Sequence, residues 1–312
     1  MRETEIEIKN RRNETLRGTL TFAPSSSPSK EEHSSVSSLA ILCHGFYAER
    51  DHFLLTRISK TLLQDDAVCD ATFRFDFSGS GESDGPWNGY GGYEEELADV
   101  EDVVTFFRSF ELNRTRVFRV TCLLGHSKGA AAPMHYAAKH DDVPVIIGLA
   151  SRFYMKSKVT SEEKKTLFEK GRISVKDEVA GNITITLTLA QYRSFAELDN
   201  TVVNAQNIKR AHTVLWIHGD RDTVTNMSNA RAYLANFYSV DASNETDEDG
   251  AADESRNAER GKSTVDARVV IVKGANHMFT APHTIEAAKI VRDALKAASQ
   301  TEHLVTTTAA KP

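Results

Sequence analysis

Apolar and polar residues alternate in the first part of the chain. This period of two is found in "TEIEIK" and again in "ETLRGTLTF", and the polar stretch "NRRN" separates the two segments. A period of two is typical of strands with one covered face. Two such strands joined by a short polar turn form a hairpin. The pattern therefore predicts an antiparallel hairpin at the N-terminus.

From about residue 39 onward, continuous apolar runs alternate with segments of helical period. The apolar runs are "LAILCHGF", "ATFRFDF", "VFRVTCLL" and "VPVIIGLA", and they are typical of strands that are buried on both faces. The segments between them include "ERDHFLLTRISKTLLQ", "GGYEEELADVEDVVTFFRSF" and "KGAAAPMHYAAKH", in which apolar residues recur at helical spacing. Alternation of this kind predicts a mostly parallel central sheet with helices on both faces.

The alternation stops at Ser151 and returns near residue 212 with "HTVLWIHG". Residues 151–211 are more charged and less regular, with a helical pattern in "TSEEKKTLFEKG" and a strand pattern in "NITITLTLAQY". They predict a small cap inserted into a core that comprises residues 1–150 and 212–312. Residues 241–262 interrupt the second part of this core. They are acidic and poor in large apolar side chains, a composition that predicts disorder.

Charge and cysteine content narrow the classes of function. The net charge of −6 gives no basic surface for nucleic acid, and no run of about 18 apolar residues predicts a membrane span. The charged start "MRETEIEIKN" shows no signal peptide, and an odd number of cysteines, 3, is typical of reduced thiols. These features predict a cytoplasmic protein. No His/Cys cluster has the spacing of a zinc site, so neither a metal nor a cofactor is expected.

Two stretches match the G-x-S-x-G pattern of a nucleophilic serine, "GESDG" at residues 81–85 and "GHSKG" at residues 125–129. The pattern has this meaning only when a strand precedes the serine and a helix follows it. Residues 125–129 fit, because an apolar strand precedes them and a helical pattern follows. Residues 81–85 lie in a glycine-rich loop. The sequence therefore predicts Ser127 as the nucleophile and gives Ser83 a supporting place.

A nucleophilic serine needs a base, and the base needs an orienting acid. His277 follows the apolar strand in "VVIVKGANH", where a loop carries it over the strand ends. His283 begins the next helix and His303 lies in the tail, so both are less suitable. The acid should also follow a strand, and "VLWIHGDRD" offers both Asp220 and Asp222.

When a serine attacks a carbonyl carbon, negative charge develops on the carbonyl oxygen, and two N–H donors are needed to stabilise this oxyanion. One is expected from the backbone of Lys128, directly after the serine, and the other from Phe46 in the loop "HGFYAE" after the first core strand. Gly45 lets the backbone approach closely in this loop. The side chain of Lys128 is expected to lie in solvent.

In chain order, the stretches "HGF", "DFSGSGESDG", "GHSKG", "HGDRD" and "GANH" resemble the motifs of the α/β-hydrolase superfamily. They are most similar to an esterase branch with feruloyl esterases, serine aminopeptidase-like hydrolases and monoacylglycerol lipases. The resemblance covers about residues 39–297, apart from the cap and the acidic insert. It implies the α/β-hydrolase fold, a triad of Ser127, Asp222 and His277, and oxyanion donors at Phe46 and Lys128.

Asp220 and Asp222 are expected to differ in role. Asp220 is placed to close the turn after its strand with its own side chain. Val224 is expected to pack inward and to carry the Asp222 carboxylate toward His277. In the cap, four aromatic residues are candidates for an acyl or aryl pocket: Phe153, Tyr154, Tyr192 and Phe195.

These features predict a serine hydrolase that cleaves a carboxylic ester of a small molecule through an acyl-enzyme. A peptidase or a thioesterase on the same triad is an alternative. A second alternative is a non-catalytic ligand-binding protein on a hydrolase scaffold, because a fold alone does not imply activity. The oligomeric state is not predicted.

Overall fold

The computed structural model describes residues 1–24, 35–64, 67–112, 116–155, 159–177, 183–238 and 265–309. The predicted acidic insert, residues 241–262, lies outside these described residues. No helix among the described residues is both long enough and apolar enough to cross a lipid bilayer.

The N-terminal hairpin is present, as the alternating pattern predicts. Strands β1 (Arg2–Lys9) and β2 (Thr15–Phe22) pair antiparallel, with Ile6 opposite Gly18 and Ile8 opposite Leu16. Ile6 and Ile8 are buried, whereas the glutamates between and beside them are not, so the period of two separates a covered face from an open one.

A central sheet joins this hairpin to the parallel strands. Among the described residues its order is β1-β2-β4-β3-β6-β7-β10-β11, with β2 antiparallel to β4 and the later neighbours parallel. A short strand, β5, pairs antiparallel with β6. The bounds of these strands are β3 (Ser35–Cys43), β4 (Ala71–Phe75), β5 (Glu111–Leu112), β6 (Arg116–His126), β7 (Val145–Leu149), β10 (Thr213–Gly219) and β11 (Asp266–Val272).

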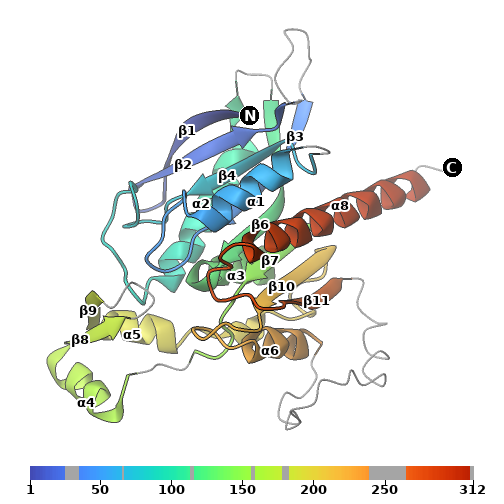
Figure 1. Ribbon diagram of the computed structural model, residues 1–312. Coiled ribbons are helices and arrows are strands. Elements are labelled where there is room, and N and C mark those ends of the chain that lie inside the picture. The colour runs from blue at the N-terminus through green and yellow to red at the C-terminus, as the bar shows by residue number, and fades with distance from the viewer. Residues whose placement is uncertain are drawn as a thin grey trace.

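Helices cover both faces of the sheet, and Figure 1 shows α1 and α8 side by side on one of them. This face carries α1 (Phe53–Leu63) and α8 (His283–Ala309), and the other carries α2 (Tyr93–Ser109), α3 (Ala131–His140) and α6 (Ser228–Phe237). Successive strand residues point to opposite faces. Accordingly, Ile146 belongs to the apolar cluster under α2 and α3, and its neighbour Ile147 to the cluster under α1 and α8. The predicted fold class is confirmed.

The segment after β7 forms a smaller group of elements beside the sheet, at the lower left of Figure 1. It contains an antiparallel pair of strands that is separate from the central sheet. Its elements are α4 (Ser161–Lys170), β8 (Arg172–Asp177), β9 (Ile183–Thr188), α5 (Leu189–Ala196) and the short η3 (Asn200–Val202).

The strand predicted over "NITITLTLAQY" is too long. Strand β9 ends at Thr188, and α5 begins at Leu189. The reason is a capping box: Thr188 Oγ1 accepts from the Gln191 N–H at 3.2 Å, and the Thr188 N–H donates to Gln191 Oε1 at 3.0 Å. Two otherwise unpaired donors are satisfied in this way, which favours a helix start at this point.

Helix α5 packs on the loop that leads into α2. A Cβ added to Gly91 would lie 2.5 Å from Gln191 Cα, so the two backbones approach closely. The Tyr93 N–H donates to Ser194 Oγ at 3.3 Å, and Tyr90 packs against a small apolar cluster that includes Tyr192. The inserted segment is therefore attached to the glycine-rich loop that follows β4.

Candidate active site

Ser127 lies at a sharp turn between a strand and a helix. Strand β6 ends at His126, the short helix η2 (Ser127–Ala130) follows, and α3 continues from it. Ser127 has φ +54°, a conformation that costs a non-glycine residue about 1–3 kcal/mol and is found mostly at functional sites. A Cβ at Gly129 would lie 1.8 Å from the His44 carbonyl oxygen, and one at Gly125 would lie 2.2 Å from that of Gly129. Both glycines of the motif are thus needed for the turn.

The structure brings Ser127, His277 and Asp222 together, although they are 150 and 55 residues apart along the chain. His277 Nε2 lies 2.9 Å from Ser127 Oγ, and His277 Nδ1 lies 2.8 Å from Asp222 Oδ2. Because a carboxylate only accepts, the Nδ1–H donates to Asp222 and leaves Nε2 free to accept from the serine hydroxyl. His277 and Asp222 are buried, and Ser127 is half-buried.

The carboxylate of Asp222 is held by several donors. Its Oδ1 accepts from the N–H groups of Val224 at 2.9 Å and Thr225 at 2.7 Å, and its Oδ2 lies 3.3 Å from His218 Nε2. Burial by itself would raise the pKa of Asp222, but hydrogen bonds from His218, His277 and the backbone lower it well below its usual range. Asp222 is therefore a charged group in a buried place.

Asp220 does not close its own turn, contrary to the expectation from the sequence. Its Oδ1 accepts from the N–H of Gly274 at 2.5 Å, and its side chain is exposed. Strands β10 and β11 are parallel neighbours, with Gly219 opposite Val272, so the loops that follow them run side by side. Asp222 closes the turn instead, through the two N–H groups that it accepts.

His126, which sequence reasoning did not single out, connects the serine turn to the His277 loop. Its Nε2 donates to the His277 carbonyl oxygen at 2.9 Å, and the two rings lie 5.2 Å apart. Burial, with a further effect of His277, lowers the pKa of His126 to about 3, so the ring stays neutral. The only signal in the sequence is its position directly before the serine.

The loop after β3 passes directly against the serine. A Cβ at Gly45 would lie 3.2 Å from Ser127 Cβ and 3.0 Å from the His126 carbonyl oxygen. His44 fixes the start of this loop, because its Nδ1 donates to the Gly45 carbonyl oxygen at 2.9 Å and its Nε2 accepts from the Phe77 N–H at 3.1 Å. Burial lowers the pKa of His44 to about 4.

The two N–H groups expected as oxyanion donors belong to Phe46 in this loop and to Lys128 in the serine turn. Among the described residues, neither N–H donates a hydrogen bond within the protein. Unpaired backbone N–H groups beside a reactive side chain are suited to donate hydrogen bonds to a ligand oxygen.

The Lys128 side chain is half-buried and paired rather than solvated, so the prediction of a solvated lysine is wrong. It is 9% exposed and forms an ion pair with Glu96 of α2, which is 13% exposed. Its ammonium group also lies 5.1 Å from the centre of the Tyr93 ring. Burial raises the pKa of Glu96, and the attraction of Lys128 opposes this effect. The helix thus supplies a partner that the local sequence around Lys128 does not reveal.

Ser83, in the second G-x-S-x-G match, has a structural role in its loop. Its hydroxyl donates to the Asp76 carbonyl oxygen at 2.6 Å and accepts from the Arg17 N–H at 2.9 Å. These bonds hold the glycine-rich loop against the N-terminal hairpin. Both the donor and an acceptor site of the hydroxyl are used, and no base contacts it among the described residues.

The four aromatic residues that are candidates for a pocket are mainly engaged in packing, the alternative role for residues of this type. Tyr192 is buried in the small cluster of the inserted segment, Phe153 packs against Tyr233 at 4.9 Å, and the Phe195 ring lies 6.3 Å from that of Tyr93. Only Tyr154 is largely exposed. No group of three or more His, Cys, Asp or Glu side chains in the described part of the chain is arranged to hold a metal ion.

A serine on a strand–turn–helix elbow, linked through a histidine to an aspartate at the strand ends, is the arrangement typical of α/β-hydrolases. The sequence model of the Alpha/beta hydrolase family matches residues 40–293. The chain belongs to this family, and the predicted resemblance is confirmed.

Solved structures of similar fold agree with this assignment. Est1E from Butyrivibrio proteoclasticus, solved with ferulic acid bound, has a TM-score of 0.67 and 17% identity over 95% of this chain and 99% of its own. Alpha/beta hydrolase GrgF from Penicillium sp. sh18 has a TM-score of 0.66 and 16% identity over 95% of this chain and 99% of its own. Mouse alpha/beta hydrolase domain-containing protein 10 has a TM-score of 0.62 and 14% identity over 94% of this chain and 99% of its own. At these identities the similarity concerns the fold. No curated protein sequence matches the chain.

Proposed function

We propose that the protein is a serine hydrolase that cleaves a carboxylic ester of a small molecule through an acyl-enzyme. Ser127 is the nucleophile, His277 acts as base and then as acid, and Asp222 orients His277. The observation that supports this best is the continuous chain of contacts from Ser127 Oγ to His277 at 2.9 Å and from His277 to Asp222 at 2.8 Å.

The first half of the reaction forms the acyl-enzyme. As Ser127 Oγ attacks the ester carbonyl carbon, His277 Nε2 takes the hydroxyl proton. The imidazolium that forms is stabilised by the charged carboxylate of Asp222. The backbone N–H groups of Phe46 and Lys128 stabilise the negative oxygen of the tetrahedral intermediate.

The second half releases the products. His277 gives its proton to the leaving alcohol oxygen as the ester C–O bond breaks, and the acyl group stays on Ser127. A water molecule then attacks the acyl carbon while His277 takes a proton from it. Collapse of this second intermediate returns the proton to Ser127 Oγ and frees the acid. Every proton step uses His277.

An ester substrate is favoured over a peptide. An aminopeptidase would require a carboxylate beside the site to bind the substrate amine, and the glutamates of the cap are the candidates. Glu162 and Glu169 are exposed on α4, and Glu163 accepts from the Thr160 N–H and hydroxyl, both at 2.8 Å, within the capping box of that helix. Two of these carboxylates face solvent and the third is engaged in its own helix cap, which supports an ester substrate.

Residues 151–211 are assigned as a cap on a core formed by residues 1–150 and 212–312. The packing of α5 on the loop before α2 supports this division, since the segment approaches the core beside Tyr93 and Lys128. A cytoplasmic location is supported by the state of Cys43, Cys69 and Cys122, which are all buried and free.

Labelling by a fluorophosphonate tests the proposed function. The reagent should modify the wild-type protein on Ser127, as located by peptide mass spectrometry, because activated serines attack phosphorus as they attack a carbonyl. Ser127→Ala should abolish the labelling, and Ser83→Ala, the matched control from the second motif, should retain it. Labelling on Ser83, or none at all on the folded wild-type protein, would refute the proposal.

A further inference from the structure

Four aromatic side chains meet where the loop after β3 contacts the loop before α2. Phe46 stacks on Tyr90 at 4.8 Å and lies 6.0 Å from Trp87, and Tyr47 meets Trp87 edge to face at 6.0 Å with 74° between the rings. This set of Phe46, Tyr47, Trp87 and Tyr90 is called the aromatic corner below.

The two outer rings of the aromatic corner are open to solvent. Tyr47 is 57% exposed and Trp87 is 40% exposed, whereas Phe46 and Tyr90 behind them are half-buried. Single exposed apolar side chains are common, but adjoining exposed aromatic rings are typical of binding surfaces. Tyr47 is also held at φ +52°, a strained conformation for a residue with a side chain. The fold thus keeps Tyr47 in a costly conformation that presents its ring.

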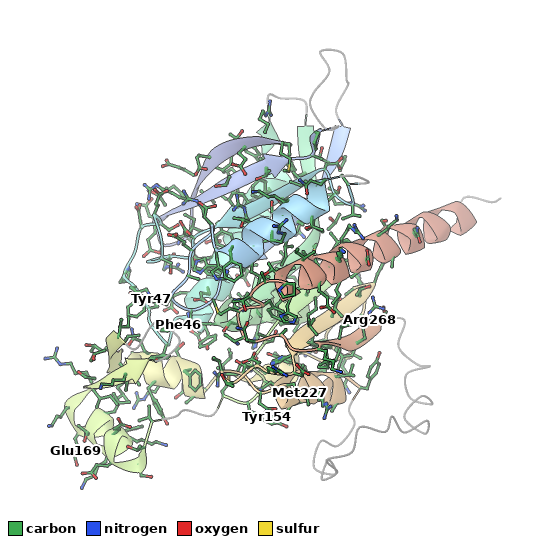
Figure 2. The ribbon with its side chains drawn as sticks, in the orientation of Figure 1. Phe46, Tyr47, Tyr154, Glu169, Met227 and Arg268 are labelled. Carbon is green, nitrogen blue, oxygen red and sulfur yellow. The ribbon has the colours of Figure 1, made fainter. Side chains whose placement is uncertain are left out.

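The aromatic corner lies beside the candidate nucleophile. Gly45 contacts Ser127, since its added Cβ would lie 3.2 Å from Ser127 Cβ, and Tyr47 is only two residues further along. The Tyr47 Cα is therefore within about 8 Å of the Gly45 Cα. Figure 2 shows Phe46 and Tyr47 together, on the side of the body that faces the inserted segment. Tyr90 packs against the apolar cluster of that segment, which supports the corner from behind.

We propose that the aromatic corner binds a planar aromatic ring of the ester substrate. This inference rests on the proposed function and specifies its substrate class. A flat ring placed in the angle between Tyr47 and Trp87 meets the face of one ring and the edge of the other, and both geometries are favoured between aromatic groups. A saturated ring of similar size gains the same apolar burial but lacks these contacts. The corner therefore selects aryl esters over cycloalkyl esters.

The test compares two methyl esters that differ only in the ring. The kcat/KM for methyl 3-phenylpropanoate should exceed that for methyl 3-cyclohexylpropanoate by about three- to tenfold, the size of typical aromatic-pair contributions. Neither ester carries an aromatic leaving group, so only the acyl ring can occupy the corner. A wild-type ratio at or below one would overturn the inference, since burial alone predicts that result.

Substitutions in the corner make the test specific. Trp87→Leu should bring the phenyl-to-cyclohexyl ratio close to one, and Trp87→Phe should keep most of it, because a ring remains. Tyr47→Leu and Tyr47→Phe should show the same contrast. The matched control is Phe168→Leu on α4, where an aromatic ring that is 50% exposed lies outside the corner. An unchanged ratio in both leucine variants of the corner would refute the inference. Since each ratio compares two substrates on one protein, a loss of folded protein does not alter it.

A binding measurement separates failure of the corner from failure of the proposed function. The chain has two tryptophans, and the second, Trp216, is fully buried in the core. Adding methyl 3-phenylpropanoate to Ser127→Ala should change the tryptophan fluorescence saturably, and Ser127→Ala/Trp87→Phe should show no such change. If the fluorophosphonate does not label Ser127, the proposed function falls, and this titration still decides on the corner. A titration without saturable change in Ser127→Ala would refute the aromatic site.

Discussion

His126 Nε2 donates a hydrogen bond to the backbone carbonyl oxygen of His277 at 2.9 Å, so the residue before the candidate nucleophile holds the loop of the candidate base. Replacing His126 by leucine should lower kcat by about 10²-fold with little change in KM, because a small displacement of His277 harms the reacting geometry more than substrate binding. Steady-state kinetics with an alkyl ester measures the split.

The control for this prediction is His126→Gln, whose side-chain amide can still donate to the His277 carbonyl oxygen. It should recover most of the lost kcat. The rate of fluorophosphonate labelling should follow kcat in both variants, since it too depends on His277. A rise in KM beside the fall in kcat, with a lowered melting temperature and no rescue by glutamine, would show a general packing role instead.

The two G-x-S-x-G serines should respond in opposite ways. Ser127→Ala should reduce kcat on p-nitrophenyl acetate by about 10⁴-fold or more, because the covalent path is lost. Ser83→Ala should retain activity within about tenfold, since no contact made only in the transition state is removed. Ser83→Ala should instead lower the free energy of unfolding in urea by about 1–2 kcal/mol, because the hydrogen bonds of the Ser83 hydroxyl with Asp76 and Arg17 are lost. Loss of activity in Ser83→Ala alone would reverse the assignment.

The half-buried ion pair of Lys128 and Glu96 gives a prediction about stability and pH. Burial holds the pKa of Glu96 above its ordinary value. A carboxyl group whose pKa is raised in the folded state contributes most to stability below its unfolded pKa, and this contribution decreases as the pH rises to the folded value. Lys128→Met removes the cation that opposes this shift, so its destabilisation relative to the wild type should grow as the pH rises above the ordinary pKa of a glutamate, about 4.3.

Glu96→Gln is the informative partner of Lys128→Met. It leaves the half-buried ammonium group without a counter-charge, which should cost less than the about 3–5 kcal/mol typical of a fully buried pair. The double variant Glu96→Gln/Lys128→Met should be more stable than Glu96→Gln, because no unpaired charge remains. Urea unfolding at several pH values measures all three. Additive effects of the two single changes would contradict a coupled pair.

Most of the fold follows from periodicity in the sequence. The period of two in β1 and β2 and the long apolar runs of β3 and β7 are local signals, and burial on two faces follows from them directly. The end of β9 was missed because Thr188 has a high preference for strands, and the capping bonds with Gln191 decide otherwise.

The positions of Ser127 and His277 could also be predicted, because each follows a recognisable strand and the strand ends of a parallel sheet lie together. The partner of Lys128 could not. Glu96 is one of three successive glutamates in the first turn of α2, and acidic residues at that position are ordinary in any helix. Only the folded structure, which places α2 beside the serine turn, shows that Glu96 is the partner of Lys128. The partner of Lys128 is determined by the position of each glutamate in the folded molecule and not by its residue type.

Asp220 and Asp222 are two residues apart, and their substitution by asparagine should separate them. Asp222 accepts from His277 Nδ1 at 2.8 Å and is held charged by its other donors, so it stays ionised in any assay above about pH 4. Asp222→Asn removes that charge and disturbs the tautomer of His277, which should lower kcat by about 10⁴-fold without unfolding.

Asp220 accepts from the Gly274 N–H at 2.5 Å, and an asparagine Oδ1 can accept the same bond. Asp220→Asn should therefore lower kcat by less than about tenfold. Asp220→Ala, which removes the acceptor, should lower kcat more than Asp220→Asn, because the Gly274 loop carries His277. Kinetics with circular dichroism decide between the two aspartates. An inactive Asp220→Asn beside an active Asp222→Asn would show that Asp220, and not Asp222, is the acid of the triad.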